Sequence, residues 1–165
     1  MTALRCTQKL LTVMKVEASK QVIPELSANR LGDWSLNLLH TRPKRVVAMC
    51  EHGRLGLALQ AAPYSNLPQR FVHAVYAQLL AIGVPQKLAQ LECEAMLPLT
   101  ITPTTLYANR LSLQANLKDY AWLVEDYMAE GENSLTVIND RLADSIVGIN
   151  GKLDFANKFV RNLLL

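Results

Sequence analysis

The fold is decided by the stretch Leu31–Ala62, LGDWSLNLLHTRPKRVVAMCEHGRLGLALQAA, which predicts three short consecutive strands. The expected strands are Trp34–His40, Arg45–Glu51 and Leu55–Gln60. Chain reversals are expected between them, because Pro43 supplies a fixed φ and Gly53 a permissive one. Two consecutive hairpins form an antiparallel β-meander over about residues 31–62, and such a sheet needs a cover on at least one face.

The alternation of apolar residues along the meander indicates which faces are covered. In the first strand Trp34 and Leu36 point to one face, while Ser35 and Asn37 point to the other. The middle strand is apolar at every position of Val46–Cys50, which suggests cover on both sides. These patterns predict an α+β layer structure rather than a bare sheet.

Helical periodicity on either side of the meander supplies the covering elements. We expect several amphipathic helices, in the ranges Gln8–Lys15, Leu67–Ile82, Pro85–Glu92, around Leu117–Met128, after Ser134, and Asp154–Leu164. One more strand is predicted at about residues 96–102, either on a sheet edge or beginning after Pro98, which cannot donate to a ladder. Gly148 and Gly151 are expected to loosen the chain before the last helix. With 165 residues, the chain is expected to form a single α+β domain over residues 1–165.

Composition narrows the classes of function. A hydrophobic fraction of 50% and a charged fraction of 19% suggest that some apolar surface is left for a partner. The net charge of +3 is too small to require nucleic acid, and no apolar run is long enough to span a bilayer. Three widely spaced cysteines without metal-ligand spacing indicate reduced thiols in a cytoplasm, and predict neither a metal nor a cofactor. Of these, Cys6 lies before a helix start, where it is either an activated thiolate or a buried structural cysteine.

Several short motifs resemble a known family. The opening RCTQKLL, the later LGDWSLN, a GVP turn and an Asn-Arg step are similar to a family of small bacterial proteins catalogued only as a domain of unknown function. The resemblance covers nearly the whole chain and implies an intracellular α+β domain. The positions that match the family motifs form a candidate polar cluster of Arg5, Thr7, Lys9, Asp33, Trp34, Asn37, Asn109 and Arg110.

Three functions remain open at this point. The first is a non-catalytic interaction module, regulatory, antitoxin-like or accessory, that binds another protein or a second copy of itself through apolar surface. Its candidate interface is on the last helix, residues 154–164, at Phe155, Phe159 and Leu163. The support is the lack of a catalytic constellation together with the low charge and the leucine-rich end.

The second function is nucleic-acid binding through the basic reversal of the meander, with Arg42, Lys44 and Arg45 as phosphate contacts. The third is an enzyme that acts on an anionic substrate, using Arg5, Asp33, Asn37, Asn109 and Arg110 if the fold brings them together. Arginine side chains suit a carboxylate or phosphate, which is why two of them beside asparagines suggest such a substrate.

Overall fold

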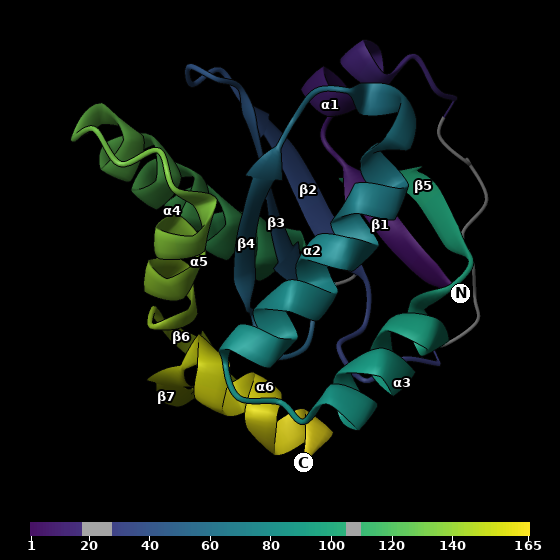
Figure 1. Ribbon diagram of the computed structural model, residues 1–165, viewed down its shortest axis with the longest axis vertical. Helices are drawn as coiled ribbons and strands as arrows, with labels where there is room; N and C mark the ends of the chain where they lie inside the picture. The colour runs from purple at the N-terminus through teal and green to yellow at the C-terminus, as the bar shows by residue number, and fades with distance from the viewer. Residues whose placement is uncertain (18–27, 105–109) are drawn as a thin grey trace.

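The computed structural model describes residues 1–17, 28–104 and 110–165. The first half of the chain forms β1 (Thr2–Cys6), α1 (Gln8–Met14), β2 (Trp34–Leu39), β3 (Arg45–Cys50), β4 (Gly56–Gln60) and the short 3-10 helix η1 (Tyr64–Asn66). The second half forms α2 (Leu67–Ala81), α3 (Gln86–Met96), β5 (Leu99–Pro103), α4 (Arg110–Ala129), α5 (Leu135–Ala143), β6 (Ile146–Ile149), β7 (Lys152–Phe155) and α6 (Ala156–Leu164). These elements form a single α+β domain (Figure 1).

The central sheet is mixed, and its strands lie in the order β4-β3-β2-β1-β5. The meander β2-β3-β4 is antiparallel and confirms the predicted pair of hairpins. The first strand β1 runs parallel to both of its neighbours, with Arg5 opposite Ser35 of β2 and opposite Thr102 of β5. Three parallel strands therefore adjoin an antiparallel hairpin pair, a topology that the meander alone does not reveal.

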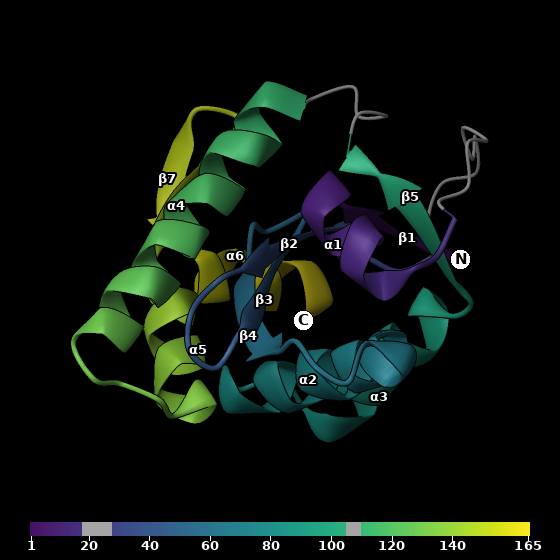
Figure 2. The same cartoon turned by 90° about the horizontal axis from the view of Figure 1, so that it is seen from above.

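Helices cover both faces of the sheet. Trp34 is fully buried on one face and packs edge-on against Phe71 of α2, with ring centroids 5.1 Å apart. On the other face Tyr120 of α4 lies directly over Gly56 of β4. In Figure 1 α2 crosses the side of the sheet nearest the viewer, and Figure 2 shows α4 on the opposite side of the sheet from α2. The predicted two-sided cover of β3 is confirmed.

The exposed edge of β4 is closed by a side chain. Asn139 of α5 accepts a hydrogen bond from the Ala58 N–H at 2.7 Å and donates one to the Ala58 carbonyl at 3.0 Å. Gln78 of α2 in turn donates to the Asn139 carbonyl at 3.0 Å. Since an unpaired strand edge invites another strand, this amide protects the sheet at its β4 side.

The starts of β5 and α6 differ from the predicted ones, and the segment at Gly148 and Gly151, predicted to be loose, is a hairpin. The strand expected at residues 96–102 is β5, which begins after Pro98 and lies on the sheet edge, while Met96 still belongs to α3. The helix expected from Asp154 begins at Ala156, because Asp154 pairs with Val147 in a hairpin. That hairpin, β6-β7, turns at Asn150-Gly151 with φ values of 51° and 78°. An Asn-Gly pair favours this turn, and the glycine-based prediction of a loose segment was wrong.

Replacing Gly56 by alanine should lower the free energy of unfolding by about 1–3 kcal/mol. An added Cβ would stand 2.5 Å from two ring carbons of Tyr120, whose hydroxyl donates to the Arg54 carbonyl at 2.6 Å and holds the ring in place. In the matched control Gly148→Ala, the Cβ meets only the mobile end of Leu153 at 3.2 Å, so a change within about 0.5 kcal/mol is expected. Urea denaturation measures both; equal midpoints would contradict this packing.

Candidate functional site

Four residues of the predicted polar cluster share one face of the sheet. Arg5 of β1 is opposite Ser35 of β2, so Asp33 and Asn37, two residues to either side of Ser35, project to the same face. The Arg5 Nη2 donates to Asp33 Oδ2 at 2.8 Å, and Asp33 Oδ1 accepts the Ala3 N–H at 2.9 Å. Asp33 thereby ties the start of β2 to β1, and its charge is neutralised by Arg5.

The other two residues, Thr7 and Asn37, meet at the carboxyl ends of β1 and β2. The Thr7 hydroxyl donates to Asn37 Oδ1 at 2.8 Å. Both side chains line a cavity of about 310 Å³, which we call the strand-end pocket. Its lining is Thr7, Ser35, Asn37, Thr104, Gln114, Leu117, Lys118 and Ala121. The pocket thus lies between the sheet and the Gln114–Ala121 part of α4.

Two further members of the predicted cluster, Trp34 and Lys9, lie elsewhere. Trp34 points to the opposite face, where it belongs to the core under α2. Lys9 is exposed on α1, and Arg110 is the first residue of α4. Asn109 lies outside the described residues. The structure therefore brings together Arg5, Thr7, Asp33 and Asn37 and places Trp34 and Lys9 apart from them.

The three predicted nucleic-acid contacts differ in how exposed their side chains are. Arg42 and Lys44 are exposed on the reversal between β2 and β3. Arg45 is only 4% exposed, and its guanidinium reaches Gln60 Oε1 at 3.5 Å and the Asn133 carbonyl at 3.3 Å. Because Arg45 is buried and its guanidinium contacts Gln60 and Asn133, it is not placed to contact a phosphate, and that prediction is corrected.

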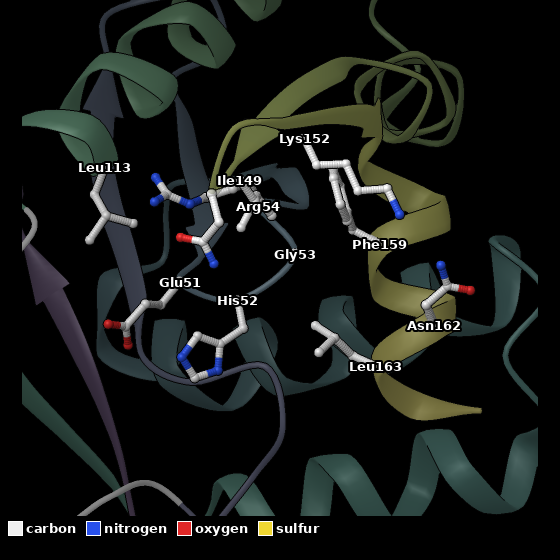
Figure 3. A pocket seen from close by; sticks show the side chains of 11 residues that line it. Glu51, His52, Gly53, Arg54, Leu113, Ile149, Lys152, Phe159, Asn162 and Leu163 are labelled. Atoms are coloured by element: carbon white, nitrogen blue, oxygen red, sulfur yellow. The ribbon is translucent and has the colours of Figure 1, made fainter.

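A larger cavity of about 500 Å³ lies beside the last helix, and we call it the helix pocket. Its lining comes from the β3-β4 reversal, α4, the β6-β7 hairpin and α6. The lining residues are Glu51, His52, Gly53, Arg54, Leu113, Ile149, Asn150, Lys152, Phe159, Asn162 and Leu163. Figure 3 shows Leu163 projecting from α6 toward the reversal that carries His52, while Phe159 lies alongside Lys152 of the β6-β7 hairpin.

The shape of the reversal explains why α6 can come so close. Gly53 and Arg54 are the last two residues of the four-residue connection between Cys50 and Leu55, and they have φ values of 86° and 56°. A Cβ on Gly53 would stand 2.7 Å from Cγ2 of Val160. Only glycine therefore combines the positive φ with the close approach of α6 at this position.

Hydrogen bonds fix the reversal from the other side. The His52 Nδ1 lies 3.1 Å from the Arg30 carbonyl, and because a carbonyl only accepts, Nδ1 carries the hydrogen in neutral His52. The Cys50 Sγ donates to the His52 carbonyl at 2.8 Å and accepts the Leu55 N–H at 3.3 Å. In neutral His52 the Nε2 atom is therefore the hydrogen-bond acceptor. The reversal that carries it is held in place by these hydrogen bonds.

The last helix divides its apolar residues between the core and the helix pocket. Ala156, Val160 and Leu164 are buried against the domain. Phe159 and Leu163, two of the predicted interface residues, line the helix pocket instead. Phe155, the third, precedes the first turn of α6 and is half-exposed outside the pocket.

The model of one protein family, Domain of unknown function (DUF6933), matches residues 3–157. The chain belongs to this family. Membership confirms the resemblance to a domain of unknown function on which the motif comparison rested. No curated protein and no solved structure matches the chain.

The described residues of this DUF6933 chain show no cluster arranged to bind a metal, and they bury the three thiols. Within residues 1–17, 28–104 and 110–165, no group of three or more His, Cys, Asp or Glu side chains is arranged to hold a metal. None of the helices in those ranges has the length and apolar character needed to cross a membrane. Burial raises the pKa of Cys6 and of Cys50 to about 12 and that of Cys93 to about 11. Of the two roles considered for Cys6, the structure therefore favours the buried structural cysteine.

The helix pocket as a whole was not predicted. Its residues come from four elements that are far apart in sequence, and only Phe159 and Leu163 carried a sequence signal, the apolar stripe of the last helix. The missed part is the hairpin wall with Ile149 and Lys152. The Asn150-Gly151 pair was the signal that would have revealed it.

The three thiols of this DUF6933 chain should react slowly with Ellman's reagent at pH 8 in the folded state. With pKa values of about 11 to 12, roughly one thiol in a thousand or fewer is thiolate at that pH, and the fraction rises tenfold per pH unit. In guanidinium chloride all three should react at the rate of a model thiol. One thiol that reacts rapidly before unfolding would contradict the burial of these side chains.

Proposed function

We propose that this protein is a non-catalytic interaction module that binds a partner protein through the helix pocket. The observation that carries this proposal is the orientation of Phe159 and Leu163. The core takes the Ala156, Val160 and Leu164 face of α6, and a second apolar face is left to line a cavity of about 500 Å³. A cavity of this volume lies within the range of about 300–1000 Å³ that ligand sites occupy.

The charges around the helix pocket favour an acidic partner segment. Arg54 and Lys152 contribute cations, and Glu51 is the only carboxylate among the described residues that line the pocket. A partner segment with an apolar side chain beside an Asp or Glu would match both the apolar residues and the cations that line the pocket.

Apolar surface next to the pocket favours a protein over a small molecule as the partner. The β6-β7 hairpin turns Ile149 and Lys152 toward the pocket, and its other face carries Ile146, Leu153 and Phe155. Leu153 is 75% exposed and Ile146 is 65% exposed. These residues face away from the cavity, so a protein that contacts both the pocket and the outer face of the hairpin would cover them, as exposed apolar patches at interaction sites are covered.

The two other functions have less support. Arg5 and Asp33 neutralise each other and are both engaged in hydrogen bonds, which leaves them poor groups for binding an anionic substrate. The nucleic-acid surface is reduced to Arg42 and Lys44, since Arg45 contacts Gln60 and Asn133. A non-catalytic interaction module would serve in a regulatory, antitoxin-like or accessory role.

The substitution Leu163→Arg should weaken partner binding, because it places a cation beside Arg54 and Lys152 and removes part of the apolar wall. Leu165→Arg is the matched control, as Leu165 is 68% exposed and does not line the pocket. The test is affinity capture from the native host with each tagged chain, followed by quantitative mass spectrometry and titration of the purified partner. We expect at least about a tenfold loss of affinity for Leu163→Arg alone.

A partner that both variants retain equally would refute the proposal. The same conclusion would follow if the wild-type chain captured no protein that binds it as a purified component. Circular dichroism of both variants checks that α6 is still folded.

A further inference from the structure

The strand-end pocket lies at the ends of two neighbouring parallel strands, β1 and β5, from which the chain continues to opposite faces of the sheet. Thr7 directly follows β1, Thr104 directly follows β5, and Asn37 lies near the carboxyl end of β2. After β1 the chain enters α1, which contacts η1 at the start of α2, while after β5 it leads to α4 on the opposite face. Figure 2 shows α2 and α4 on the two sides of the sheet. In open sheets with parallel strands, ligands bind in the crevice at such a point.

Five of the eight residues that line the strand-end pocket carry neutral hydrogen-bonding groups, namely Thr7, Ser35, Asn37, Thr104 and Gln114. The Thr7 hydroxyl donates to Asn37 Oδ1, so the Asn37 amide keeps its NH2 donor and Thr7 keeps an acceptor oxygen. Thr104 adds a hydroxyl, and Gln114 adds an amide with both a donor and an acceptor. Such groups match the hydroxyls of a ligand, which also donate and accept.

The positive charge of Lys118 favours a ligand with a negative charge. Lys118 is the only charged side chain among the described residues that line it. Arg5 and Asp33, on the same face of the sheet, pair at 2.8 Å and cancel. Leu117 and Ala121 of α4 are buried and form an apolar side of the pocket. The combination suits a ring with C–H and hydroxyl groups and one anionic substituent.

We propose that the strand-end pocket binds a small hydroxylated anion about the size of one hexose, with its carboxylate or phosphate at Lys118. The cavity of about 310 Å³ is at the lower end of the range for small-molecule sites, which favours one ring over a dinucleotide. This site is separate from the helix pocket and does not depend on the proposed interaction function.

Titration of the labelled full chain by two-dimensional NMR tests this proposal with glucose 6-phosphate, glucuronate and glucose. We expect saturable shifts of the amides of Thr7, Asn37, Gln114 and Lys118 with at least one of the two anions. The two anions separate phosphate from carboxylate recognition, and glucose serves as the uncharged comparison. Lys118→Gln should weaken the binding of that anion by about tenfold or more, because it removes the charge-assisted bond.

Lys87→Gln is the matched control, because Lys87 is exposed on α3 and does not line this pocket; binding should be unchanged. Lys118 is also exposed, so both variants should fold. The proposal is overturned if neither anion binds at up to about 10 mM. Shifts confined to residues outside the pocket, or equal binding by Lys118→Gln and the wild type, would overturn it as well.

Discussion

The close contact between the β3-β4 reversal and α6 is the constraint on which the helix pocket depends. Gly53 leaves no room for a side chain against Val160, and the turn requires its positive φ. The reversal is held from beneath by Tyr120, whose hydroxyl binds the Arg54 carbonyl, and by Cys50, whose thiol binds the His52 carbonyl. With the reversal fixed in this way, α6 packs by one face and turns Phe159 and Leu163 toward the cavity.

Helix α4 contributes residues to both pockets. Leu113 lines the helix pocket, while Gln114, Leu117 and Lys118 line the strand-end pocket. Successive residues of a helix point about 100° apart, so neighbouring positions on one turn can serve two separate cavities. The helix pocket has charges of both signs in its lining and exposed apolar residues on the hairpin next to it, whereas the strand-end pocket lies against the sheet and has Lys118 as the only charged side chain among the described residues that line it. These differences are why we assign a protein partner to the first and a small anion to the second.

The meander and its two covered faces could be predicted because they depend on local signals, namely a period of two residues and the turn residues Pro43 and Gly53. The pairing of Arg5 with Asp33 depends on the parallel register of β1 with β2, which no local pattern encodes. Arg45 was misjudged because its partners, Gln60 and Asn133, come from other elements. The apolar stripe of the last helix was recognised, but the hairpin that completes its pocket was not, although Asn150-Gly151 indicated it.

Hydrogen–deuterium exchange on the chain with and without its purified partner tests the central claim most directly. The account predicts slower exchange in residues 51–55, in the β6-β7 hairpin and in α6, which surround the helix pocket. Slower exchange only at the reversal around Arg42 and Lys44, with the helix pocket unchanged, would contradict it.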